Sequence, residues 1–99
     1  MNSREQVEAY VARRLEVLDG VRQLLVDHLH VRCRPDQIDP DVSIFGTGLG
    51  LDSVDAVELV LCVETELGVK LEDQDLVRGA TRTVGSLVDR VLAATEAKP

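Results

Sequence analysis

Apolar residues recur along the chain at steps of three and four, and no alternating pattern lasts long enough to predict a sheet. The first stripe runs from Val7 to Leu29, and Ser3 and Gln6 form a potential capping box at its start. Gly20 interrupts this stripe, because glycine inside a helix costs about 1 kcal/mol relative to alanine. The apolar positions stay in phase across Gly20, which slightly favours one helix from about Ser3 over two helices meeting at the glycine.

Further helical patterns follow a long connection. Residues 32–50 contain prolines and several glycines, with apolar positions that can pin this connection onto a core: Ile38, Val42, Ile44 and Phe45. Residues 53–68 form a second helical pattern closed by Gly68, and residues 71–80 can form one or two turns. Residues 83–95 form a last helix with an apolar stripe at helical spacing: Val84, Leu87, Val88, Val91 and Leu92. The sequence predicts an all-α fold: a small four-helix bundle, with three longer helices and one short one, and a long loop between the first and second main helices.

Composition and charge limit the classes of function open to this chain. The 99 residues support one small domain, with a net charge of −7 and only two aromatic residues, Tyr10 and Phe45. Residues 35–75 hold eleven acids and one base, so we expect an acidic interaction surface in the middle of the chain and no nucleic-acid binding. The longest apolar run, residues 59–63, is too short to span a membrane. The sequence shows no leader-like segment, and we interpret Cys33 and Cys62 as free thiols. The chain is therefore expected to be cytoplasmic and monomeric.

The chemically informative segment is residues 48–55, GLGLDSVD, where the long loop meets the second helix. Asp52 and Ser53 are both good N-capping residues, so the simplest interpretation is that one of them caps this helix. The alternative is that Ser53 presents an exposed hydroxyl at a helix N-terminus. There, free backbone amides and the positive end of the helix dipole favour an attached phosphate.

The segment FGTGLGLDSVDAVELV, followed by ExELGV, resembles the acyl carrier proteins over about residues 17–95. In that family the serine of an LGxDSL motif carries 4′-phosphopantetheine, and a phenylalanine lies eight positions before it, as Phe45 does before Ser53. Two departures are visible. Gly48 stands where many members have aspartate, and Val54 stands in place of the usual leucine.

The resemblance implies a carrier that is not itself an enzyme. Ser53 would receive phosphopantetheine from coenzyme A through a Mg²⁺-dependent phosphopantetheinyl transferase, and Asp52 would support the transferase metal. No metal site of the chain's own is expected. Acyl groups would then be held as thioesters for fatty acid biosynthesis. The resemblance divides the chain into a helical extension (residues 1–15), a carrier domain (16–95) and a frayed tail (96–99).

Helical spacing predicts which face of the second helix is available to partners. Five residues are expected to face the core: Ala56, Leu59, Val60, Val63 and Leu67. An acidic outer face with an apolar insert is expected to bind basic patches on acyl-transferring, condensing and other synthase enzymes; it contains Val54, Asp55, Glu58, Leu61 and Thr65. Cys62 also falls on this outer half, although a small, inert cysteine is the simpler interpretation.

Several alternatives stay open. A specialised carrier for polyketide or aryl-polyene synthesis fits the same motif, and an aminoacyl carrier fits less well because of the acid before Ser53. From a different class, the chain could be an unmodified acidic helical adaptor. Other sites are disfavoured: a hydrolase lacks convincing partners for Ser53, and a nucleotide loop at residues 46–50 lacks a preceding strand and a lysine. His28 and His30 have no metal-site spacing, and nothing suggests a pocket around Glu64 and Glu66.

Overall fold

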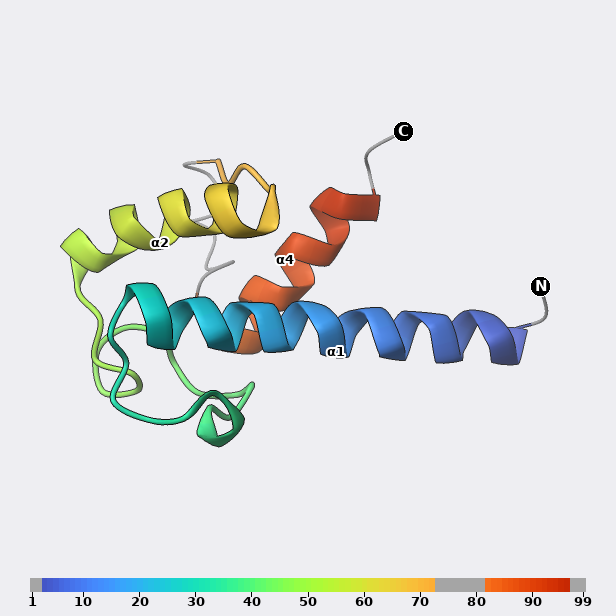
Figure 1. Cartoon of the computed structure of the whole chain (residues 1–99), viewed down its shortest axis with the longest axis horizontal. Helices are drawn as coiled ribbons and strands as arrows, with labels where there is room; N and C mark the ends of the chain where they lie inside the picture. The colour runs from blue at the N-terminus through green and yellow to red at the C-terminus, as the bar shows by residue number, and fades with distance from the viewer. Residues whose placement is uncertain (1–2, 73–81, 97–99) are drawn as a thin grey trace.

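The computed structural model describes residues 3–72 and 82–96, and the regular elements in these residues are all helices, with no strand among them. Helix α1 spans Ser3–His28, the 3-10 helix η1 spans Pro35–Gln37, α2 spans Ser53–Leu67 and α4 spans Val84–Glu96. Helices α2 and α4 lie against α1, and the connection from α1 to α2 wraps one end of the bundle (Figure 1). The predicted short fourth helix, residues 71–80, falls almost entirely outside the described residues.

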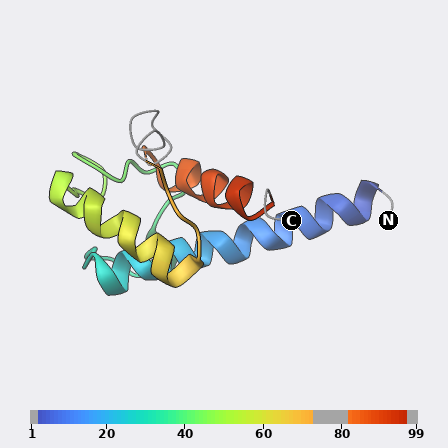
Figure 2. The ribbon, with the colours of Figure 1, turned by 90° about the horizontal axis from the view of Figure 1, so that it is seen from above.

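Helix α1 is continuous through Gly20, as the phase of its apolar stripe favours. A Cβ at this position would lie 3.1 Å from Cδ2 of Leu67, so the glycine lets α2 approach closely. Only the C-terminal part of the stripe is buried, from Leu18 onward. The N-terminal half of α1 extends past both α2 and α4 in two perpendicular views (Figures 1 and 2).

The core combines apolar side chains from α1, α2 and α4 with residues of the connection. Ile38 and Ile44 are buried, while Val42 and Phe45 are half-buried against the same core. From α4, all five apolar positions of the predicted stripe are buried: Val84, Leu87, Val88, Val91 and Leu92. The periodicity therefore identified the core face of the last helix correctly.

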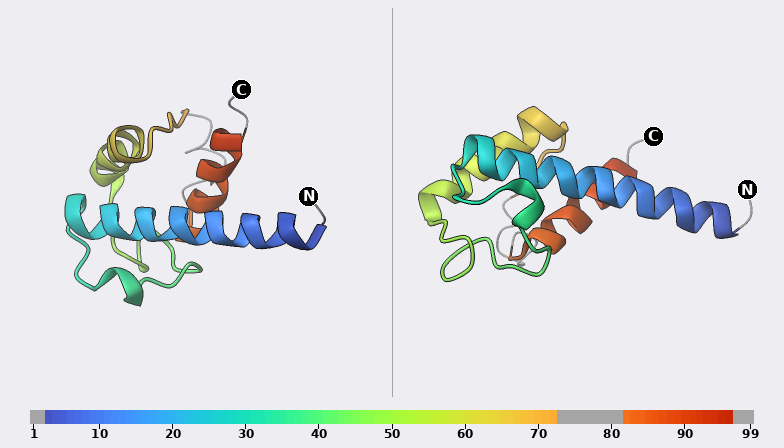
Figure 3. Two further views of the ribbon diagram at one scale, coloured as in Figure 1. Left: turned by 45° about the vertical axis from the view of Figure 1, so that its right-hand side comes forward. Right: turned by 60° about the horizontal axis from the view of Figure 1, so that its bottom comes forward.

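Backbone hydrogen bonds fasten the connection to the start of α4. The Ile44 amide donates to the Arg82 carbonyl at 3.0 Å, and the Val84 amide donates to the Val42 carbonyl at 3.1 Å. An antiparallel bridge pairs Ser43 with Thr83 in the same place. The Arg22 guanidinium of α1 also donates to the Ile38 carbonyl at 2.9 Å. The loop that leads into α2 is thus fixed to two helices; its course is visible in both views of Figure 3.

Candidate functional site

Helix α2 begins with a reciprocal capping box. The amides of Val54 and Asp55 both donate to Oδ1 of Asp52 at 3.0 Å, and the Asp52 amide donates to Oδ2 of Asp55 at 2.9 Å. Of the two candidate capping residues, Asp52 is therefore the N-cap. Ser53 is the first residue of the helix; its side chain is exposed and has no hydrogen bond within the described part of the chain. The Ser53 hydroxyl is therefore accessible from solvent.

The cap also sets the charge of Asp52. The Asp55 amide, first among several hydrogen bonds, lowers the pKa of the Asp52 carboxyl below its usual value, because amide donors stabilise the ionised form. Both amides reach the same oxygen, Oδ1, so Oδ2 is left as a second acceptor. A carboxylate next to Ser53 therefore stays ionised at neutral pH.

The loop before Ser53 is held by its own backbone. A parallel bridge pairs Phe45 with Leu51, and the Leu49 amide donates to the Ser43 carbonyl at 2.8 Å. At Gly48, an added Cβ would lie 1.9 Å from that same carbonyl oxygen. The structure thus gives a physical reason for the glycine that departs from the common family pattern: no side chain fits there in this loop conformation.

The outer face of α2 is partly as predicted. Val54 and Leu61 are 75% and 54% exposed, and Glu58 and Thr65 are exposed beside them. Asp55 is half-buried, and its carboxylate is engaged in the cap rather than presented freely to a partner.

Sequence reasoning missed Val57, which is 63% exposed on this face. Its spacing of three from Val54 and four from Leu61 is the signal that could have found it.

The outward placement of Cys62 is wrong. The side chain is buried against the core, because α2 turns the side containing Leu59, Cys62 and Val63 inward. Burial raises the pKa of the Cys62 thiol, and the Glu58 carboxylate, whose Oε1 accepts from Sγ at 3.8 Å, raises it further. A protonated, buried thiol is a poor nucleophile, which supports the inert interpretation of this residue.

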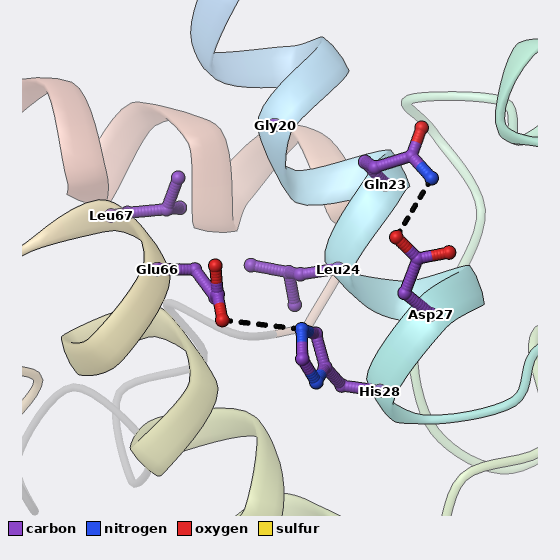
Figure 4. A pocket seen from close by; sticks show the side chains of 7 residues that line it. All are labelled: Gly20, Gln23, Leu24, Asp27, His28, Glu66 and Leu67. Atoms are coloured by element: carbon purple, nitrogen blue, oxygen red, sulfur yellow. Dashed lines mark hydrogen bonds and ion pairs between the residues drawn. The ribbon is translucent and has the colours of Figure 1, made fainter.

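Two shallow hollows flank a contact between His28 of α1 and Glu66 of α2, contrary to the expectation that Glu66 has no pocket nearby. Nε2 of His28 lies 3.3 Å from Oε1 of Glu66. One hollow of about 200 Å³ is lined by Gly20, Gln23, Leu24, Asp27, His28, Glu66 and Leu67 (Figure 4). The other, about 180 Å³, is lined by His28, Glu58, Leu61, Cys62, Thr65 and Glu66. Glu64 lines neither, so the two glutamates do not form a carboxylate pair in either hollow.

The described residues contain neither a cluster of metal ligands nor a membrane-spanning helix. No group of three or more histidine, cysteine or acidic side chains is placed to hold a metal ion in that part of the chain. Within the same residues, no helix is both long enough and apolar enough to cross a membrane. Cys33 and Cys62 are both free thiols.

An exposed serine at a capped helix start, beside an acidic and apolar helix face, is the arrangement expected of a carrier. Residues 19–91 match the family described as "Phosphopantetheine attachment site". The chain belongs to this family, so it is a carrier and not an enzyme, and its cofactor is phosphopantetheine.

Two similar curated proteins are both named acyl carrier protein. One, from Thermosynechococcus vestitus, is 34% identical over 74 residues, covering 75% of this chain and 85% of the relative. The other, from Solidesulfovibrio magneticus, is 36% identical over 61 residues, covering 62% and 74% of the two chains. The resemblance to acyl carrier proteins is thus confirmed.

Among solved structures, the fold resembles a chain in the crystal structure of an engineered Bradyrhizobium japonicum glycine:[carrier protein] ligase complexed with a carrier protein from Agrobacterium tumefaciens and ATP. The TM-score is 0.65 at 21% identity, and the match covers 78% of this chain and 97% of the other. At this identity the likeness concerns the fold alone.

Proposed function

We propose that Ser53 is the phosphopantetheine attachment residue and that the arm holds acyl intermediates as thioesters for fatty acid biosynthesis. The observation that carries the proposal is the division of roles at the start of α2. Asp52 supplies the cap, so the Ser53 hydroxyl is exposed and unengaged among the described residues. If a serine side chain capped the helix, modification would break its hydrogen bond to a backbone amide. Modification of Ser53 breaks no such bond, because Asp52 is the cap.

The local electrostatics support attachment of a phosphodiester here. The first turn of α2 directs backbone amides and the positive end of the helix dipole toward Ser53. Asp52 accepts two of these amides through Oδ1, and its Oδ2 is the group we assign to supporting the Mg²⁺ of the phosphopantetheinyl transferase. The transferase would supply the metal and coenzyme A, while this chain supplies the hydroxyl and one carboxylate.

The partner surface we propose is the outer face of α2, consisting of Val54, Val57, Glu58, Leu61 and Thr65. Asp55, whose carboxylate is engaged in the cap, lies at its edge. Exposed apolar side chains provide small anchors, and Glu58 provides charge that attracts basic patches on the transferase and on synthase enzymes. Carriers must leave each enzyme quickly, and small charged contacts favour fast exchange over tight binding. Free thiols at both cysteines are compatible with a cytoplasmic site of action.

The test begins with the unmodified protein. Incubation with a broad-specificity phosphopantetheinyl transferase, coenzyme A and Mg²⁺ should add one arm per chain, measured by intact mass spectrometry. Loading with an acyl group should then give an adduct that hydroxylamine removes, as expected of a thioester. A chain that accepts no arm would instead act as an acidic adaptor. An arm that accepts amino acids but not fatty acyl groups would contradict the fatty acid role while leaving the carrier role intact.

A further inference from the structure

The apolar stripe of α1 continues beyond the bundle and is exposed there. Leu18 and Val21 are buried, whereas the preceding apolar side chains of the same helix are about half exposed: Val7 60%, Tyr10 46%, Val11 49% and Leu15 53%. These four lie on the same side of the helix as the core positions, since they recur at steps of three, one and four residues. We call residues 3–16 the projecting segment (Figure 2).

The projecting segment is separate from the carrier site. It precedes residues 19–91, which match the family, and it forms the opposite end of α1 from the start of α2 (Figure 1). Arg14 forms an ion pair with Asp89 of α4, and Leu18, one turn further, is buried. Within the described structure, therefore, the bundle covers the stripe only from about this point onward.

Charge indicates what can cover this stripe. Residues 3–16 contain three arginines and three glutamates and so have no net charge, whereas the rest of the chain carries the entire −7. Two copies meeting through any strongly acidic surface would repel each other, but two projecting segments would not. A neutral segment also lacks the charge that would attract the basic enzymes expected at α2, or an anionic lipid surface.

The order of the charges favours an antiparallel contact. The N-terminal half of the segment holds Arg4, Glu5 and Glu8, and the C-terminal half holds Arg13, Arg14 and Glu16. In a parallel pair each side chain would oppose its own kind. In an antiparallel pair centred near Val11, the more acidic half of one copy lies beside the more basic half of the other, and Val7 lies opposite Leu15.

We propose that two copies of this chain associate through their projecting segments, packed as an antiparallel helix pair. This replaces the expectation of a monomer and is independent of the proposed attachment at Ser53. The four exposed side chains present roughly 350 Å² of surface per chain, within the usual range for the largest apolar patch of a monomer and small for a protein interface. The dimer is therefore weak and forms at high protein concentration, leaving both carrier sites accessible.

Sedimentation equilibrium of the full chain tests the proposal. Between about 5 µM and 500 µM, the average mass of the wild type should rise from one chain toward two, the range expected for a small interface. Val11→Glu should remain at one chain mass throughout. Ala9→Glu introduces the same charge at an exposed position on the opposite side of α1, and it should associate like the wild type. Circular dichroism checks that both variants stay folded.

A separate variant tests the antiparallel orientation of the two projecting segments. Glu8→Arg places arginine near Arg13 and Arg14 of an antiparallel partner and should weaken association several-fold. In a parallel pair, like charges face each other before and after the change, so unchanged association would contradict the antiparallel packing. The proposal fails if the wild type keeps one chain mass at every concentration, or if Val11→Glu associates as strongly as the wild type. Binding of a monomeric wild type to neutral phosphatidylcholine vesicles would assign the stripe to lipid instead.

Discussion

Asp52 links the local fold to the chemistry of the site, because one carboxylate caps α2 and adjoins the Ser53 hydroxyl. The sequence narrowed the cap to Asp52 or Ser53 and could not choose between them by residue preference alone. The deciding partner is Asp55, whose side chain returns a bond to the Asp52 amide. An acid three residues after a capping residue is the signal of a capping box, so this choice was within reach of the sequence.

The capping role predicts a pH dependence of stability. The folded-state pKa of Asp52 is lowered, so its contribution is present above the unfolded value, near 3.8, and is lost as the pH falls through the folded value. Asp52→Asn keeps a capping side chain but does not titrate. Urea unfolding from pH 6 to pH 3 should show the wild type losing stability relative to Asp52→Asn in the acidic range. A constant difference across that range would contradict the capping role of the ionised carboxylate.

Gly48 yields a second prediction at the residue scale. Because an added Cβ would lie 1.9 Å from the Ser43 carbonyl oxygen, Gly48→Ala must displace the loop. The free energy of unfolding should fall by about 1–3 kcal/mol, as for other overpacked sites. Thr47→Ala, at the exposed neighbouring position, should change it by less than about 0.5 kcal/mol. Equal unfolding midpoints for the two variants in urea would show that the loop accepts a side chain at position 48.

Among the elements, α2 shows where helical spacing succeeds and where it fails. Spacing alone gives the angles between residues but not the direction of the neighbouring helices. Helical spacing placed Leu59 and Val63 in the core correctly, but it gave Val60 and Leu67 equal weight. Packing in the bundle leaves those two half-buried and buries Cys62 instead. The same packing exposes Val57 and partly buries Asp55.

Helix α1 shows a second limit of predicting burial from helical periodicity. Its phase across Gly20 predicted a continuous helix, but periodicity does not reveal how far the neighbouring helices extend, so the exposure of Val7 and Leu15 could not be foreseen. Gly20 itself marks close helix packing rather than a break.

The outer face of α2 predicts weak, salt-dependent recognition. Glu58→Lys should lower the association rate constant with the transferase and change the dissociation rate constant less, because exposed charges act mainly by steering. The effect should fade once the salt concentration exceeds about 0.1 M, where exposed charges are screened. Leu61→Ala should instead speed dissociation. Glu16→Lys makes the same charge change on α1 and should leave the rates near those of the wild type. Transferase kinetics across a salt series measure all three, and equal low-salt rates for Glu58→Lys and wild type would show that this face is merely solvated.

At the scale of the whole molecule, charge is divided between two ends with different properties. The acidic residues concentrate in residues 35–75, which contain the carrier site, while the projecting segment of α1 is neutral and apolar along one side. The all-helical class and the start of α2 follow from sequence patterns, because they depend on local periodicity and capping. The rotation of α2 and the exposed part of α1 depend on contacts between distant segments, which local patterns do not encode.

The most direct test of the central claim is to locate the arm on the chain. After transferase treatment, peptide mass spectrometry should find phosphopantetheine on the peptide containing Ser53 and nowhere else. Ser53→Ala should accept no arm, whereas Ser3→Ala, which removes an exposed hydroxyl from the first turn of α1, should be modified like the wild type. An arm retained in folded Ser53→Ala, or found on another residue of the wild type, would contradict the assignment of the site.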